Sequence, residues 1–225
     1  VPEGFENFVF LSQVQQGLAI KTGVEFWRHL QPTCMGTLYW QLNDVWPVCS
    51  WSSLEYSGKW KLLHYMAKRF YAPVIVTTFQ NKDGALEVWA VNDTHQPQSV
   101  KAALQIWDLA GKVRKQEEYT GVVPAGGASL LAVRSLEQLA PRPDEVFAFL
   151  ELTGDGIYHY NDHFFTEYKR CHLPEASLKA AAREVNGSYQ VEVSTDMPAF
   201  FVSLECKGIR GEFDDNCFTL LPGKP

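Results

Sequence analysis

Six short runs in which apolar and polar residues alternate fill the middle of this 225-residue chain. Turn sequences separate them, among them Asp83-Gly84, Ala110-Gly111 and Gly126-Gly127. The runs are Val74–Gln80, Ala85–Val91, Val100–Trp107, Val113–Gly121, Ala128–Ser135 and Val146–Glu151. Alternation with a period of two places every second side chain on one face of a strand. The spacing therefore predicts an antiparallel, immunoglobulin-like β-sandwich over residues 73–153.

A second β-rich block is expected over residues 154–225. A glycine-containing break at residues 153–162 precedes it, and strands are predicted at Ser188–Ser194 and Ala199–Cys206. A further strand would be needed after the final Leu-Leu-Pro-Gly-Lys-Pro to cover the edge of the sheet. The second sandwich is therefore expected to be incomplete.

The first 72 residues follow a helical period instead. Residues 5–30 predict a helix, which Gly17 and Gly23 are expected to divide into two pieces. Met35–Leu42 is apolar on both faces, as a strand buried within a parallel sheet would be, and a helix is expected at about Lys59–Phe70. The order helix, buried strand, loop, helix indicates an α/β arrangement.

A single parallel strand cannot satisfy its own hydrogen-bonding edges. Residues 1–72 are therefore expected to be the end of a larger α/β domain, and the whole chain a piece of a longer protein. The predicted fold is multidomain, with an α/β part followed by two all-β parts.

Composition excludes several classes of function. The net charge is −6 and no basic stripe is present, so nucleic acid is not a predicted partner. No segment reaches the roughly 20 apolar residues of a membrane-spanning helix, so a soluble protein without a membrane partner is expected. The compartment stays open between bacterial cytoplasm or periplasm and a lysosomal or secreted location.

The sequence contains no motif that predicts a bound cofactor or metal ion. His159, His163, Cys171 and His172 are metal-ligand types, but the spacing of the first two fits a helix and they lie in a β-rich block. No nucleophile elbow, phosphate loop or dinucleotide loop is present. The five cysteines lack paired spacing, so free and mostly buried thiols are expected; they are Cys34, Cys49, Cys171, Cys206 and Cys217.

Two glycosylation sequons begin at Asn92 and Asn186. Both are interpreted as turn sequences, because Asn, Asp and Gly favour tight turns.

Residues 36–74 read GTLYWQLNDVWPVCSWSSLEYSGKWKLLHYMAKRFYAPV and carry a resemblance to a known family. This stretch resembles the eighth strand, the following loop and the last helix of the (β/α)8 TIM barrel in β-mannosidases of glycoside hydrolase family 2. Residues 10–30 are similar to the seventh barrel helix, and residues 211–223 to the last immunoglobulin-like domain. The resemblance implies that residues 1–72 are the C-terminal remnant of that barrel.

The same resemblance implies an activity for the intact protein. It would be a retaining, exo-acting hydrolase of terminal non-reducing β-D-mannose residues in oligosaccharides or glycoconjugates, completed by upstream barrel and N-terminal domains. The two catalytic glutamates of the family lie at the ends of strands four and seven and would precede Val1. No catalytic residue is therefore expected here. Glu25 falls on a predicted surface helix and Glu55 in the loop beyond the eighth strand, and neither is assigned that role.

Four residues of the loop are the expected substrate-binding residues. In such barrels the active site lies at the C-terminal ends of the strands. Trp40, at the strand end, is expected to be the hydrophobic platform beneath the sugar, sharing a face with Leu38 and Leu42. Asn43 and Asp44 are expected to contact the sugar or position the loop, and Trp46 to form the pocket wall.

Two alternatives remain open. One is another family 2 glycosidase, of β-galactosidase or β-glucuronidase type. The other is a pair of sandwiches that bind carbohydrate or act as a scaffold without catalysis, with Trp89 and Trp107 as candidate contacts. Both of these tryptophans lie on the apolar side of their runs, which favours the core, and neither non-catalytic alternative accounts for residues 36–74.

Overall fold

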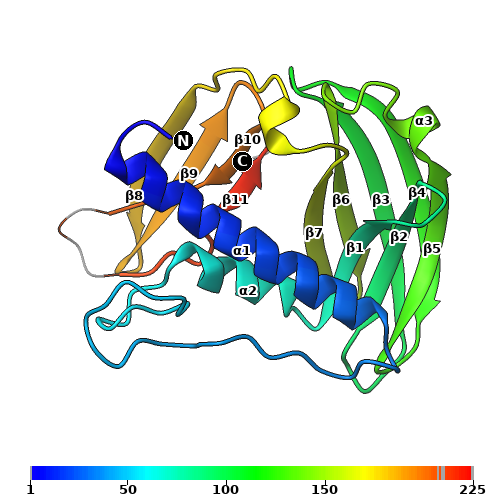
Figure 1. Ribbon diagram of the computed structural model, residues 1–225, viewed down its shortest axis with the longest axis horizontal. Coiled ribbons are helices and arrows are strands. Elements are labelled where there is room, and N and C mark those ends of the chain that lie inside the picture. Colours follow the sequence, from blue (N-terminus) through cyan, green and yellow to red (C-terminus); the bar gives the residue numbers. More distant parts are fainter. Residues whose placement is uncertain (1, 207, 209–210, 224–225) are drawn as a thin grey trace.

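The computed structural model describes residues 2–206, 208 and 211–223. Two helices begin the chain, and a four-residue helix and a single 3₁₀ turn interrupt the strands that follow. The elements are α1 (Phe5–His29), α2 (Leu62–Phe70), β1 (Val74–Gln80), β2 (Ala85–Asn92), β3 (Gln98–Asp108), β4 (Val113–Val123), β5 (Gly127–Ser135), α3 (Leu136–Leu139), β6 (Val146–Gly154), β7 (Ile157–Phe164), the 3₁₀ turn Tyr168–Arg170, β8 (Leu178–Val185), β9 (Ser188–Thr195), β10 (Ala199–Val202) and β11 (Phe218–Leu220). Figure 1 shows the sandwich of β1 to β7 at one end of the molecule and strands β8 to β11 at the other, with α1 extending from one end to the other.

The predicted sandwich is confirmed and forms from strands β1 to β7. A three-stranded sheet, in the order β1-β2-β5, faces a four-stranded sheet in the order β4-β3-β6-β7, with antiparallel neighbours throughout. Alternate residues of β2 and β3 fill the space between the sheets; they are Leu86, Val88, Ala90, Val100, Ala102, Leu104 and Ile106. The period-two pattern of the sequence thus supplies this core directly.

The sandwich extends beyond the boundary expected at residue 153. Strand β7 pairs with β6 from Gly154↔Ile157 to Phe147↔Phe164, so residue 153 lies next to a hairpin turn inside the sheet. The glycine-containing break therefore connects two strands of one sandwich and does not separate two domains. The reason is that Asp155-Gly156, with Gly156 at a φ of 65°, closes a tight hairpin.

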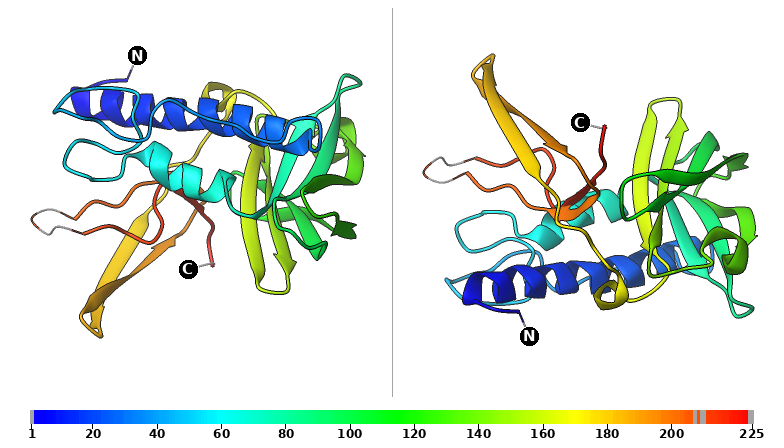
Figure 2. Two further views of the ribbon diagram at one scale, coloured as in Figure 1. Left: turned by 90° about the horizontal axis from the view of Figure 1, so that it is seen from below. Right: turned by 90° about the horizontal axis from the view of Figure 1, so that it is seen from above.

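The C-terminal part contains two separate strand pairs. Strands β8 and β9 form a hairpin around Asn186-Gly187, both with positive φ, as a two-residue turn requires. This hairpin projects away from the rest of the molecule (Figure 2), and every residue of β8 is exposed. Strands β10 and β11 pair beside it around Val193, Val202 and Leu220. The strand expected at Ala199–Cys206 ends at Val202.

Helix α1 is a single helix of 25 residues and not the two pieces expected from its glycines. A Cβ atom at Gly17 would lie 2.3 Å from the sulfur of Met66 on α2. The glycine is used for close contact between the two helices, and the packing of Val14 and Val24 against Leu63 and its neighbours compensates for its low helix propensity.

Polar residues of α1 attach it to the sandwich. The guanidinium of Arg28 donates to the carbonyls of Phe70 and Ala72 and to the carboxylate of Asp93. Glu25 was expected on a surface helix, but it is buried and accepts a hydrogen bond of 2.7 Å from Thr77. The sequence-based view of Glu25 is wrong because its side of the helix packs against the sandwich.

Asn92, the first sequon residue, is fully buried. Its amide donates to the carbonyls of Gln96, Val123 and Pro124, and its Oδ1 accepts from the backbone of Thr94. Asn92 is the last residue of β2 and its side chain holds the turn that follows, so a glycan could not be attached to it without breaking these hydrogen bonds.

All five cysteines lie in the described part of the chain and are free. Burial was expected for most of them, but Cys217 alone is buried, and Cys49 and Cys206 are exposed. Among the described residues no helix is long and apolar enough to span a membrane.

Candidate functional site

Residues 35–42 form no strand of a sheet, in contrast to the sequence-based prediction, and the backbone bends at Trp40 and Leu42. The described residues supply this segment with no strand on either side, and a lone strand cannot form its ladder of hydrogen bonds. A short parallel contact does form just beyond it, where Asn43 bridges to Leu54. The peptide bond between Trp40 and Gln41 is cis.

Side chains along this segment still alternate between two environments. Thr37 and Tyr39 face α2, where the hydroxyl of Thr37 lies 2.9 Å from that of Tyr71 and the ring of Tyr39 stacks on the ring of Tyr71. Leu38 and Trp40 point the other way, with exposed fractions of 97% and 74%. The residues that share the face of Trp40 are therefore apolar and uncovered in this chain.

The hydroxyl of Ser53 forms hydrogen bonds with residues 39 and 42 on the side of the segment opposite the Trp40 indole. It donates to the carbonyl of Leu42 at 2.9 Å, and it lies 2.9 Å from the Tyr39 hydroxyl and 3.0 Å from Nδ1 of His64. The backbone N–H of Ser53 donates to the carbonyl of Gln41 at 3.1 Å. One buried residue thus contacts the chain at positions 39, 41 and 42, on both sides of Trp40.

Asp44 lies beneath the loop and does not face solvent. Its carboxylate accepts hydrogen bonds from the Ser50 hydroxyl and from the ammonium of Lys61, which is 3.2 Å away. The Lys61 ammonium also donates to the Ser52 hydroxyl at 2.7 Å. The hydrogen bond from Ser50 is the main cause that lowers the pKa of Asp44. The carboxylate is therefore ionised, and its hydrogen bonds with Ser50 and Lys61 stabilise the loop.

The remaining loop residues are presented outward. Trp46 and Trp51 are 62% and 60% exposed, and Asn43 is exposed as well. The Asn43 amide donates to the carbonyl of Asp44 at 3.1 Å, which turns it along the loop. Of the four predicted substrate-binding residues, the structure exposes Trp40, Asn43 and Trp46 and buries Asp44.

Apolar side chains are also exposed on the first turns of α1. Phe5 is 79% exposed, and Phe8 and Leu11 are about half exposed. Figure 2 shows that the chain between α1 and α2 runs back along α1 from the sandwich to the N-terminal end of the helix. A surface of this kind is typical of a contact with another part of a protein or with a ligand.

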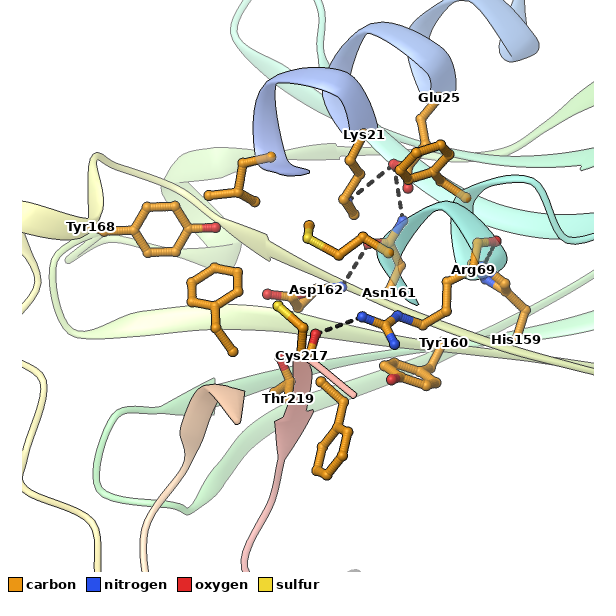
Figure 3. Close-up of a pocket in the computed structure, with 15 residues that line it drawn as sticks. Lys21, Glu25, Arg69, His159, Tyr160, Asn161, Asp162, Tyr168, Cys217 and Thr219 are labelled. Carbon is orange, nitrogen blue, oxygen red and sulfur yellow. Dashed lines mark hydrogen bonds and ion pairs between the residues drawn. The ribbon is translucent and has the colours of Figure 1, made fainter. Parts of the chain in front are cut away.

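A small cavity of about 40 Å³ lies elsewhere, between α1, α2, β7 and β11. Figure 3 shows Lys21 and Glu25 on one side and Asp162, Arg69 and Cys217 on the other. Burial raises the pKa of the Asp162 carboxyl and raises that of the Cys217 thiol to about 11. The cavity is large enough for water but too small for a sugar ring.

His159 and His163, considered above as metal-ligand types, both lie on β7. The backbone N–H of Val76 donates to Nδ1 of His159, so Nε2 carries the proton and donates to the carbonyl of Arg69. Burial lowers the pKa of both imidazoles to about 4. Within the described residues no group of three or more His, Cys, Asp or Glu side chains could hold a metal ion.

Comparison with known proteins places this geometry in a family. The model of a mannosidase Ig/CBM-like domain matches residues 84–170, and that of a mannosidase Ig-fold domain matches residues 173–225. The β-mannosidase of Bos taurus is 32% identical over 96% of this chain. The crystal structure of the β-D-mannosidase from Dictyoglomus thermophilum covers the whole chain at 31% identity, with a TM-score of 0.88.

The chain corresponds to the C-terminal part of a family 2 β-mannosidase. It spans about a quarter of the length of its β-mannosidase relatives, 26% of the bovine protein and 27% of the bacterial one. The exo-chitosanase of Amycolatopsis orientalis shares the fold at 19% identity, with a TM-score of 0.69 over 94% of this chain. Similarity of fold alone therefore does not distinguish a β-mannosidase from an exo-chitosanase.

The boundary between the two matched domains, at residues 170–173, lies after β7 and the 3₁₀ turn. It agrees with the strand pairing. The sequence contained no signal for the Ser53 contacts or for the Asp44–Lys61 pair, because serine and lysine in a loop are ordinary surface residues until the tertiary fold buries them.

Proposed function

We propose that this chain is the C-terminal part of a retaining, exo-acting β-mannosidase that removes terminal non-reducing β-D-mannose from oligosaccharides or glycoconjugates. The observation that carries the proposal is the similarity to β-mannosidases over nearly the whole chain, which includes the segment around Trp40 as well as the two immunoglobulin-like domains. Retaining hydrolysis requires two carboxylic acids about 5 Å apart. We place both of them in upstream segments.

The exposed apolar surface supports an upstream partner within the same protein. We infer that residues 1–72 complete a (β/α)8 barrel, in which Met35–Leu42 is the last strand. The other strands would supply the hydrogen bonds that this segment lacks here and would cover Phe5, Phe8 and Leu38. The alternation of half-buried and exposed side chains from Thr37 to Leu42 supports this inference, because the side chains of a strand alternate between its two faces.

Within that barrel, we assign Trp40 as the platform for the sugar. An exposed indole at the end of a barrel strand offers a flat apolar face to the C–H groups of a pyranose ring. Trp46 would form part of the pocket wall, and the exposed amide of Asn43 would contact hydroxyl groups. Asp44 fits the other role considered for it, because its carboxylate already holds the loop through Ser50 and Lys61.

The sugar is tested by a panel of 4-nitrophenyl glycosides with a full-length protein that contains this chain. We expect the highest kcat/KM for the β-D-mannoside, and NMR should detect β-mannose as the first product, as retention requires. A higher kcat/KM for the β-galactoside, β-glucuronide or β-glucosaminide would assign the protein to another specificity. The fold shared with an exo-chitosanase is the reason to include the last of these substrates.

The isolated 225-residue chain serves as the second arm of the experiment. It should release no nitrophenol above the buffer rate, because the proposed catalytic carboxylates are not among its residues. Turnover by the isolated chain that is abolished by Glu25→Gln or Glu55→Gln would place the chemistry within these residues and contradict the proposal.

A further inference from the structure

Ser53 makes polar contacts with residues on both sides of Trp40, and the proposed function assigns it no role. Ser53 is completely buried, as is the neighbouring Ser52, in a loop that exposes Trp46 and Trp51. Its backbone N–H donates to Gln41, and its own carbonyl accepts from the backbone of Lys61 at the start of α2. Ser53 therefore connects the strand-like segment on one side to α2 on the other.

The protons around the Ser53 hydroxyl can be assigned from its bonding capacity. A hydroxyl donates one hydrogen and accepts up to two. The carbonyl of Leu42 can only accept, so it takes the hydrogen of Ser53. The Tyr39 hydroxyl must then donate to Ser53, and so must Nδ1–H of His64. Each of these three bonds has a fixed direction.

The arrangement leaves the indole of Trp40 free while its backbone is held. Tyr39 is fixed through its side chain, and the carbonyls of Gln41 and Leu42 are both occupied by Ser53. The Tyr39 ring also stacks on Tyr71, which limits its movement. The position of the exposed indole is consequently set from the buried side of the segment.

The three hydrogen bonds of the Ser53 hydroxyl can persist when His64 gains or loses a proton. Because His64 donates through Nδ1, both its neutral and its protonated forms can keep the bond to Ser53. No other described acidic or basic side chain is recorded within hydrogen-bonding distance of the Ser53 hydroxyl.

We propose that Ser53 is the positioning residue for the sugar-binding Trp40, acting through Tyr39, Leu42 and His64 and not by contact with substrate. The proposal rests on the proposed function, since it assumes that Trp40 stacks on the sugar. Ser53 serves this role as serine because one small hydroxyl meets a carbonyl, a phenol and an imidazole at 2.9–3.0 Å in a space closed to solvent.

The test is a double-mutant cycle in the full-length protein, with 4-nitrophenyl β-D-mannoside as substrate. Ser53→Ala should lower kcat/KM by about tenfold, because a small misplacement of a substrate-binding group is costly in rate. If Ser53 acts through Trp40, the double variant Trp40→Ala/Ser53→Ala should be no slower than Trp40→Ala alone. A purely structural role would instead make the two losses multiply.

Controls separate the possible outcomes. Ser57→Ala, at an exposed serine of the same loop, should leave kcat/KM unchanged. Tyr39→Phe removes one donor and keeps the ring, so it should show the same non-additivity with Trp40→Ala even if Ser53→Ala does not fold. If the losses of kcat/KM in the single variants multiply in the double variant, Ser53 has no positioning role. Unaltered kinetics in both Ser53→Ala and Tyr39→Phe would lead to the same conclusion, and neither result would affect the proposed role of Trp40 as the sugar platform. Unaltered kinetics in Trp40→Ala would instead reject the proposed platform, and the positioning role with it.

Discussion

The guanidinium of Arg28 on α1 lies 2.8 Å from the carboxylate of Asp93, which follows β2. The same guanidinium donates to the carbonyls of Phe70 and Ala72, at the end of α2. One buried side chain therefore joins both helices to the sandwich.

Replacement of Arg28 by alanine should strongly destabilise the chain. The change leaves two carbonyls at the end of α2 without their donor and removes the ion pair with Asp93, which keeps its hydrogen bond from Gln31. The free energy of unfolding should therefore fall by about 3 kcal/mol. Arg114→Ala is the matched control, because Arg114 also pairs with an aspartate, Asp108, but is 61% exposed. That variant should lose less than about 1 kcal/mol in urea denaturation. Equal losses would show that the Arg28 contacts are not important for stability.

Two histidines of β7, the buried His159 and the half-buried His163, predict that acid destabilises the fold. Burial lowers the pKa of His159 and of His163 to about 4, from 6.5. The unfolded chain therefore binds more protons, so stability is complete above pH 6.5 and is lost as the pH falls towards 4. Each histidine should remove about 2 kcal/mol of unfolding free energy between pH 7.5 and pH 5.

Urea denaturation at the two pH values measures this effect. His159→Gln should reduce the loss at pH 5 by about half, since two histidines contribute equally by this argument. His95→Gln, at an exposed position, should keep the full loss. A wild-type stability that is the same at pH 5 and pH 7.5 would contradict the assignment of neutral imidazoles.

The two glycines of α1 should respond to alanine with opposite signs. A Cβ at Gly17 would lie 2.3 Å from the Met66 sulfur, whereas a Cβ at Gly23 would meet Trp27 at an ordinary 3.5 Å. Gly23→Ala should raise the free energy of unfolding by about 0.5–1 kcal/mol through helix propensity. Gly17→Ala should lower the melting temperature, because Met66 is buried and must move. A gain in both variants would mean that the helices are loosely packed.

Strands β1 to β6 could be predicted from the sequence because each is a short run of alternating or continuous apolar residues between turn sequences. Strand β7 could not, since His159 and Asn161 point into the protein and interrupt the apolar pattern. Their polarity is compensated by partners from β1 and α2, which no local pattern reveals. Strand β8 was missed for a different reason, because it is exposed on both faces and shows no alternation that burial would impose.

Of the candidate site, only the exposed residues around Trp40 could be predicted from the sequence. Alternation along residues 37–42 correctly separated the face of Trp40 from that of Tyr39. The buried half depends on contacts between residues 39, 53 and 64, which the chain brings together only in the folded state. Asp44 illustrates the same limit, since its burial comes from Lys61, seventeen residues away.

The role of Trp40 is tested most directly by steady-state kinetics of Trp40→Ala in the full-length protein, with 4-nitrophenyl β-D-mannoside. Trp51→Ala is the matched control, because Trp51 is another exposed tryptophan of the same loop. We predict a fall in kcat/KM of about two orders of magnitude for Trp40→Ala, with little change in melting temperature, since an exposed indole contributes little to the core. Trp51→Ala should stay within about twofold of the wild type. An unaltered kcat/KM in Trp40→Ala, with a large loss of melting temperature, would contradict the account and make Trp40 a packing residue.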